Sequence, residues 1–256
     1  MHPTFINLFG IQITWYGVMV ALAFVVMWFS AVFRGKKLGY SEDFIQNLLT
    51  IIVISAFVFA RLLHVVVDWD MYAADPSKIL LSRDGYVFLG GFVGAVCVSI
   101  WYIRRNNQSI FGIADLFAPF LALAHGIGRI GCFLFGCCYG KVCSAAYGLQ
   151  FPEDSPAYID HFNHGLIDSS ASHSLPVYPT QLYHSLFNFL NFGILLFILS
   201  RQKFKGQIAM GYLMIYSTGR FIVEFYRGDY RGAIGILSTS QIIAITLFAG
   251  GLIGYI

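Results

Sequence analysis

Hydrophobic residues are gathered into seven long blocks separated by short polar segments, and they do not alternate with polar residues along the chain. Each block approaches the roughly 20 residues that a helix needs to cross about 30 Å of hydrocarbon. The pattern predicts an all-α integral membrane protein with seven transmembrane helices. The predicted helices cover residues 14–33, 44–67, 87–103, 116–135, 182–199, 210–225 and 236–256.

Composition excludes the main alternative classes. The 256 residues are 57% hydrophobic and only 11% charged, whereas about 25% of residues are charged in ordinary globular domains. A water-soluble domain is therefore excluded, and a net charge of +3 is too small to suggest a nucleic-acid partner. The first block has no basic segment before it and no small-residue cleavage site after it, so we expect it to remain as a membrane helix.

Positive residues predict the orientation of the helices, because short cytoplasmic loops retain Lys and Arg. The loops after the first, third and fifth blocks carry this charge, which places all three on the cytoplasmic side. The N-terminus is then expected outside and the C-terminus inside. The residues concerned are Arg34, Lys36, Lys37, Arg104, Arg105, Arg201, Lys203 and Lys205.

One polar insertion interrupts the hydrophobic pattern. Residues 143–178 lie between the fourth and fifth blocks and contain several acidic residues and serines. We expect a single transmembrane domain, residues 1–256, with this insertion as a small extramembrane cap. Its size excludes an independent catalytic domain.

Three arginines and one glutamate lie within the predicted spans, where each charge costs about 2.5–3.5 kcal/mol on insertion scales. Arg61, Arg129, Arg220 and Glu224 all fall in the C-terminal halves of the second, fourth and sixth blocks. These three spans run in the same direction, so the four charges are expected to approach the outer leaflet together.

The balance of these charges favours an anion-binding pocket. Arg220 and Glu224 are four residues apart and can form an ion pair on one helical face. Glu224 could do no more than neutralise one arginine, but one carboxylate cannot neutralise three. Arginine suits the bidentate recognition of phosphate oxygens, and at this depth a phospholipid head group is the expected anion.

Histidine and glycine residues add less specific signals. His125 precedes Arg129 by one helical turn and is a candidate base, whereas His184 reads as a packing residue. The glycines around them fit close helix packing or close approach of the backbone to a ligand. These glycines are Gly126, Gly128, Gly131 and Gly136.

Four cysteines follow closely on this stretch. Cys132, Cys137, Cys138 and Cys143 lack the paired C-x2-C spacing of structural zinc sites, which argues against a metal centre. A disulfide from Cys143 to Cys137 or Cys138 is favoured near the oxidising outer face. Simple packing of small apolar residues is equally open for Cys132.

Several motifs, spread over the whole chain, resemble those of the bacterial prolipoprotein diacylglyceryl transferases. The two arginine-bearing stretches are the specific part of the likeness. The matching segments are Trp15-Tyr16-Gly17, Gly90-Gly91, GRIGCFLFGCCYG at 128–140, YPTQLY at 178–183 and GRFIVEFYRGDYRG at 219–232.

This resemblance implies a multi-pass enzyme of the bacterial inner membrane. It would transfer the sn-1,2-diacylglyceryl group of phosphatidylglycerol to the lipobox cysteine in the signal peptide of a prolipoprotein, releasing glycerol phosphate, with no metal or other cofactor. The polar insertion would be the periplasmic head. The lipid-binding and catalytic positions of the family match Tyr16, Arg129, Gly140, Arg220, Glu224 and Arg227.

The chain departs from the family pattern where a base is expected. Members commonly carry a histidine directly before the paired glycines, and this chain has Leu89. Cys132 and Cys137 replace an asparagine and an acidic residue, Phe135 replaces another amide, and Tyr178-Pro179 replaces a His-Pro pair. His125 is then the best candidate base, and two alternatives stay open: the same donor chemistry with another acceptor, or a lipid-binding or translocating protein without chemistry.

Overall fold

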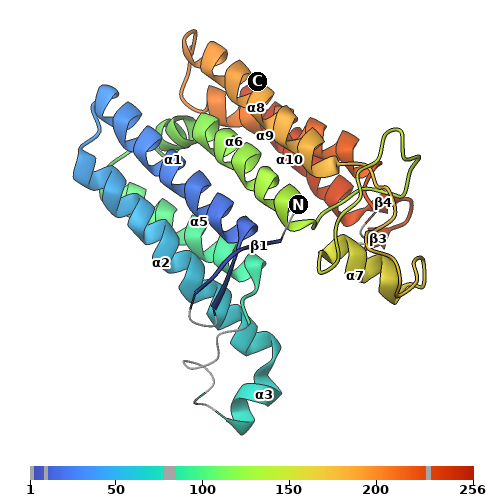
Figure 1. Cartoon of the computed structure of the whole chain (residues 1–256). Coiled ribbons are helices and arrows are strands. Elements are labelled where there is room, and N and C mark those ends of the chain that lie inside the picture. The colour runs from blue at the N-terminus through green and yellow to red at the C-terminus, as the bar shows by residue number, and fades with distance from the viewer. Residues whose placement is uncertain (1–2, 9–10, 76, 78–84, 229–231) are drawn as a thin grey trace. The chain divides into compact units, whose positions relative to one another are not determined.

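The computed structural model describes residues 3–8, 11–75, 77, 85–228 and 232–256, and its long elements are all helices (Figure 1). A helix forms at each of the seven predicted blocks, with ends that differ from the prediction by a few residues. The long helices are α1 (Trp15–Lys37), α2 (Glu42–Val67), α5 (Phe88–Arg105), α6 (Ile110–Phe135), α8 (Thr180–Leu199), α9 (Gln207–Glu224) and α10 (Thr239–Tyr255).

Five of these helices, α1, α2, α5, α6 and α8, are long and apolar enough to cross a membrane. Helix α10 is apolar but shorter, and α9 is not among the five. Helix α9 carries Gln207, Arg220 and Glu224 within its 18 residues, which lowers its hydropathy. The chain is therefore a multi-pass helical membrane protein.

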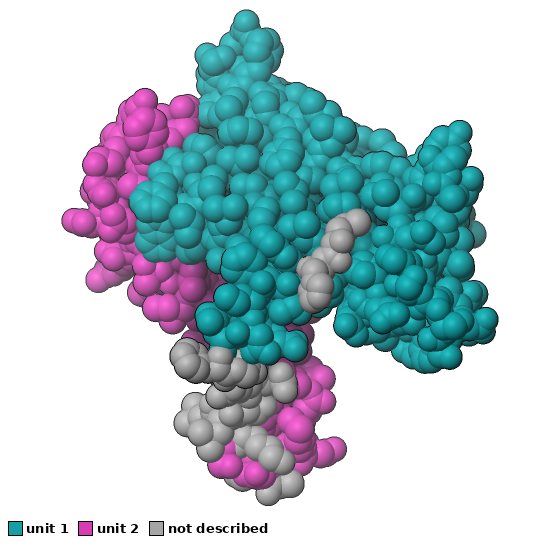
Figure 2. Space-filling model, viewed as in Figure 1, with its two compact units in different colours: residues 1–30, 114–256 teal, residues 31–113 magenta. Residues whose placement is uncertain are grey.

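The helices divide into two compact units, shown in different colours in Figure 2. Unit 1 contains residues 1–30 and 114–256, and unit 2 contains residues 31–113. Most of the residues singled out from the sequence belong to unit 1. Arg61 and Leu89 belong to unit 2.

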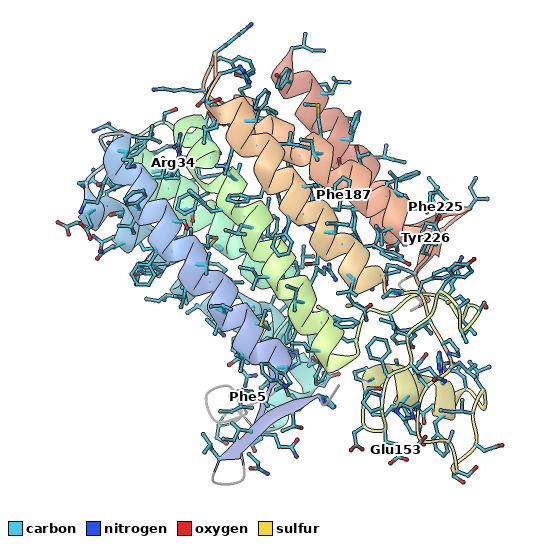
Figure 3. All side chains as sticks on the ribbon, turned by 45° about the horizontal axis from the view of Figure 1, so that its top comes forward. Phe5, Arg34, Glu153, Phe187, Phe225 and Tyr226 are labelled. Atoms are coloured by element: carbon cyan, nitrogen blue, oxygen red, sulfur yellow. The ribbon has the colours of Figure 1, made fainter. Side chains whose placement is uncertain are left out.

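Unit 1 has a core between α6, α8 and α9. Buried side chains from all three helices meet there, with Ala122, Leu195 and Ile208 fully enclosed. Helices α8 and α9 approach closely because Gly219 lies against the Phe187 ring, where a Cβ atom would come within 2.2 Å of a ring carbon. Figure 3 labels Phe187 on α8.

The start of α9 and the start of α10 are held by specific polar contacts. Buried Asp115 of α6 accepts hydrogen bonds from the backbone amides of Ile208 and Ala209, each at 2.9 Å, and from that of Gly206. These are amides that a helix start leaves without an intrahelical partner. Helix α10 begins at a capping box between Ser238 and Gln241.

The polar insertion has its own small core. Helix α7 (Pro156–Asn163) packs Ala157 against Tyr139, Phe151 and Val177. The Nδ1 atom of buried His161 accepts a hydrogen bond from the Leu175 amide at 3.2 Å. Burial lowers the pKa of this histidine, which favours the neutral ring.

Unit 2 is built on the pair α2 and α5. Gly90 and Gly91 allow this close packing, because a Cβ at either position would lie within 2.8 Å of an atom of α2. The paired glycines thus serve helix packing here. The short helix α3 (Trp69–Ala74) follows α2.

Two hairpins complete the described elements. Strands β1 (Thr4–Leu8) and β2 (Ile11–Thr14) pair in an antiparallel arrangement directly before α1. Strands β3 (Ala233–Ile234) and β4 (Leu237–Ser238) pair in the same way before α10. The hydrophobic pattern predicted neither hairpin, because strands this short leave no clear periodic signal.

A candidate anion-binding site

The centre of the candidate site is Glu224 at the end of α9. Its Oε2 atom lies 3.0 Å from the Nη2 atom of Arg220 and 3.8 Å from the Nε atom of Arg227. All three side chains are at least 89% buried, with exposed fractions of 7%, 11% and 2%. One carboxylate therefore serves two buried guanidinium groups.

Arg220 is held by further polar contacts from neighbouring helices. Its Nη2 atom donates a hydrogen bond to the Ser240 hydroxyl at 2.7 Å, and its Nη1 atom lies 3.2 Å from Nε2 of His184 on α8. Ser238 in turn donates a hydrogen bond to Glu224 at 2.9 Å. The guanidinium orientation is thus fixed by α8, α9 and α10 together.

Arg129 supplies a third positive charge to the same site. This half-buried side chain on α6 is within electrostatic range of Arg220 and of His184. Among the described residues it has no hydrogen-bond or ion-pair partner. Among the described residues, three guanidinium groups and the carboxylate of Glu224 are therefore brought to this site, and this predominance of positive groups suits an anion.

A backbone crossing positions Arg227. Gly140 and Arg227 form an antiparallel bridge, and the Lys141 amide donates to the Tyr226 carbonyl at 2.8 Å. A Cβ at Gly140 would lie within 2.7 Å of the Tyr178 and Tyr226 backbone oxygens, so this position requires glycine. Figure 3 labels Tyr226 just beyond the end of α9.

Tyr16 and His125 flank Arg129 within unit 1. Tyr16, at the start of α1, is 44% exposed and lies within electrostatic range of Arg129. His125 instead makes a 2.9 Å contact through Nδ1 to the Tyr212 hydroxyl. Its ring centroid lies 5.2 Å from that of Tyr216. The candidate base therefore contacts tyrosines of α9.

Arg61 belongs to unit 2 and has its own surroundings. Its Nη1 atom donates a hydrogen bond to the Gly85 carbonyl at 3.0 Å. The guanidinium also lies over the rings of Tyr72 and Tyr86, at 5.3 and 5.7 Å from the centroids.

Helix α8 carries a buried polar face that the hydrophobic pattern did not predict. Buried polar side chains recur on this helix every three or four residues. One of them, Ser185, donates a hydrogen bond to the Gly126 carbonyl at 2.8 Å. Both side-chain amide atoms of Asn191 lack a hydrogen-bond partner among the described residues. The helical spacing of these residues within an apolar block is the signal that would have found them. They are Gln181, His184, Ser185, Asn188 and Asn191.

The cysteines behave differently from the prediction. No disulfide links Cys143 to Cys137 or Cys138. Instead, the sulfur atoms of Cys132, Cys137 and Cys138 all lie within 4.8 Å of one another. Hydrogen bonds from the Cys132 and Cys137 thiols lower the pKa of the Cys138 thiol, and the nearby guanidinium groups of Arg227 and Arg129 act in the same direction.

Known proteins resemble this chain over nearly its full length. A sequence model of the family described as prolipoprotein diacylglyceryl transferase matches residues 3–256. The chain is 38% identical over 252 residues to phosphatidylglycerol--prolipoprotein diacylglyceryl transferase 2 of Clostridium perfringens (strain 13 / Type A), covering 97% of this chain and 92% of that protein. It is 36% identical over 245 residues to phosphatidylglycerol--prolipoprotein diacylglyceryl transferase of Clostridium tetani (strain Massachusetts / E88), covering 96% and 93%.

Proposed function

Because the chain belongs to the prolipoprotein diacylglyceryl transferase family, we propose that it catalyses diacylglyceryl transfer from phosphatidylglycerol. The acceptor is the lipobox cysteine thiol in the signal peptide of a prolipoprotein, and the released product is glycerol phosphate. The observation that carries this proposal is the cluster in which Arg220 and Arg227 contact the Glu224 carboxylate and Arg129 lies within electrostatic range of Arg220.

The donor phosphate binds between Arg129 and Arg220. Glu224 holds the Arg220 guanidinium in place through the 3.0 Å ion pair, so the phosphate meets a fixed donor. Arg227, on the same carboxylate, adds positive charge to the site. Tyr16 donates a hydrogen bond to the head group from its partly exposed position. Guanidinium groups suit this task because they offer paired N–H donors to phosphate oxygens.

Gly140 and Arg61 complete the proposed lipid contacts. Gly140 lies at the backbone crossing that holds Arg227, where a side chain would collide with the Tyr178 and Tyr226 backbone oxygens. Arg61 is the other proposed lipid contact, and within unit 2 Gly85 and two tyrosines orient its guanidinium.

The chemical step is substitution at carbon. The acceptor thiolate attacks the glyceryl carbon that carries the phosphate oxygen, the new C–S bond forms, and the C–O bond breaks. The leaving glycerol phosphate takes the electron pair, and the excess positive charge of the cluster stabilises it. The thiol must first lose its proton, because a free thiol has a pKa of about 8.5 and is mostly protonated at neutral pH.

His125 is the proposed proton acceptor for this thiol. It precedes Arg129 by one helical turn, so the base and the phosphate site lie on one face of α6. Its Nδ1 atom is engaged by the Tyr212 hydroxyl at 2.9 Å, which leaves Nε2 for the acceptor. Replacing His125 with Gln tests this role, and unchanged transfer would assign it to another group.

The proposed setting is the bacterial inner membrane, crossed seven times. Helices α9 and α10 would supply the two crossings beyond the five apolar helices. The positive charge after α1, α5 and α8 supports a cytoplasmic location for those ends, with the N-terminus and the head at residues 143–178 on the periplasmic side. Cysteine accessibility labelling of intact cells tests this arrangement.

A transfer assay with the purified full chain tests the function. Phosphatidylglycerol vesicles and a lipobox peptide are supplied, and mass detection follows the gain of diacylglyceryl on the peptide. A peptide with serine in place of the lipobox cysteine is the control. Transfer to a small thiol or alcohol but not to the peptide would indicate another acceptor. Lipid binding without released glycerol phosphate would indicate a protein that binds lipid without chemistry.

A further inference from the structure

We infer that Cys132, Cys137 and Cys138 form a binding site for one thiophilic divalent metal ion such as zinc. The fourth coordination position of this ion is open and binds the acceptor thiol. The three sulfur atoms lie within 4.8 Å of one another. In a tetrahedral zinc site with Zn–S bonds of about 2.3 Å, neighbouring sulfurs lie roughly 3.8 Å apart. The cluster therefore needs only small side-chain adjustments to hold an ion.

Local backbone geometry creates this cluster despite unfavourable sequence spacing. Helix α6 ends at Phe135, and Gly136 turns the chain with a φ of +81°. Cys138 then adopts a φ of +61°, a left-handed conformation that costs a residue with a side chain about 1–2 kcal/mol. The turn folds Cys137 and Cys138 back toward Cys132 in the last turn of the helix.

The N-terminal end of α8 holds the strained turn in place. The Gln181 side chain donates to the Cys137 carbonyl at 2.8 Å, and the Thr180 hydroxyl donates to the Cys138 carbonyl at 2.9 Å. Both α8 side chains are fully buried. The sulfur positions are therefore set by contacts from a second helix, as metal sites require of their supporting residues.

Charge and exposure suit a three-thiolate site. Three thiolates around a divalent ion carry a net negative charge, and Arg129 and Arg227 are both within electrostatic range of Cys138. Cys132 is buried, while Cys137 and Cys138 are partly exposed, which leaves a side from which a fourth ligand can approach. Three protein ligands with an open position are typical of catalytic zinc sites.

The open position gives this chain a way to activate the acceptor where the family's histidine is replaced by Leu89, and this role depends on the proposed function. A thiol that coordinates zinc is deprotonated. Its proton passes to His125, the proton acceptor proposed above, its sulfur attacks the glyceryl carbon, and the phosphate oxygen departs with the C–O electron pair toward the arginines. The thioether product binds metal more weakly than a thiolate and is released.

Metal binding is measured first, without reference to activity. The reduced full chain in detergent is titrated with Co²⁺, and thiolate-to-metal charge-transfer and d–d absorption are recorded, followed by competition with Zn²⁺. We expect one ion per chain. Cys132→Ser, Cys137→Ser and Cys138→Ser should each weaken binding by more than the about 10- to 100-fold that follows loss of an outer-shell partner.

Cys97 and Cys143 provide matched controls, since neither belongs to the cluster. Cys97→Ser and Cys143→Ser should leave the Co²⁺ spectrum and stoichiometry unchanged. Absence of a charge-transfer band, or a band equally reduced by the control variants, would overturn the metal site. Folding of each variant is checked by its thermal transition without metal.

The second measurement tests the open position. A lipobox peptide is added to the Co²⁺-loaded protein, with the serine peptide as the control. A further sulfur ligand should intensify the charge-transfer band only with the cysteine peptide. An unchanged spectrum would show a site without a role for the acceptor and overturn this part of the inference. Transfer that proceeds in metal-free protein would overturn the activating role while leaving the proposed function intact.

Discussion

Arginines occur in both units of the molecule, but their surroundings differ. In unit 2, Arg61 contacts a backbone carbonyl and two tyrosine rings. In unit 1, Arg220 and Arg227 contact the carboxylate of Glu224, and Arg129 lies within electrostatic range of Arg220. The comparison teaches that a lone arginine in a membrane helix does not by itself indicate a binding site. An excess of positive charge gathered in one place is the feature that favours anion binding.

The largest expected effect comes from reducing that excess. Replacing Arg129 or Arg220 with Gln should lower transfer to the lipobox peptide about 10²- to 10³-fold, the range seen when one donor to a developing negative charge is lost. The initial rate of peptide modification measures this. Near-normal transfer in either variant, with folded protein, would contradict the phosphate site.

Removing the shared carboxylate should act on stability as well as activity. In Glu224→Gln, the buried guanidinium groups of Arg220 and Arg227 lose the charge of this carboxylate, which is expected to cost about 3–5 kcal/mol in the free energy of unfolding. Thermal unfolding in detergent measures the loss. Glu153→Gln, at an exposed position in the head, is the control and should leave the transition unchanged. Figure 3 labels Glu153.

A smaller effect is expected for Arg61→Gln. Loss of the hydrogen bond to Gly85 should weaken donor binding by about tenfold or less, corresponding to about 1.4 kcal/mol. The change should appear in KM for phosphatidylglycerol, with kcat retained. A loss as large as that of the Arg129 variant would remove the distinction between the two arginine environments.

The smallest effect concerns the head and leaves the arginine charges untouched. Burial lowers the pKa of His161 below the ordinary value of 6.5, so the unfolded chain binds a proton more readily than the folded one. Its stabilising contribution is complete above that ordinary pKa and is lost as the pH falls through the folded pKa. Thermal unfolding should therefore occur at a lower temperature at about pH 5 than at neutral pH. His161→Gln should lessen this dependence.

Sequence patterns predicted the helices well because long apolar blocks have few structural solutions in a membrane. The Arg220–Glu224 pair was equally accessible, since residues four apart on a helix are neighbours. Helical spacing also marks the polar face of α8, although an apolar average conceals it. Composition alone could not place Arg61 in a different unit from Arg129.

Features that depend on turns and crossings could not be predicted. The approach of Cys132 to Cys137 and Cys138 follows from the left-handed turn after α6 and from contacts with α8. Ser240 reaches Arg220 because β3 and β4 reverse the chain before α10. Neither relation has a fixed sequence spacing, so only three-dimensional packing reveals it.

The fastening of α9 at both ends has a mechanical consequence. The Asp115 carboxylate accepts hydrogen bonds from backbone amides in the first turn of this helix. Just past its last turn, the β-bridge between Gly140 and Arg227 holds the chain. Sliding the helix by one turn, about 5.4 Å, would break both attachments at once. We therefore expect α9 to resist shifting along its axis, so that its charged side chains stay at one level in the membrane. Entry and exit of lipid are then expected to involve movement of other segments.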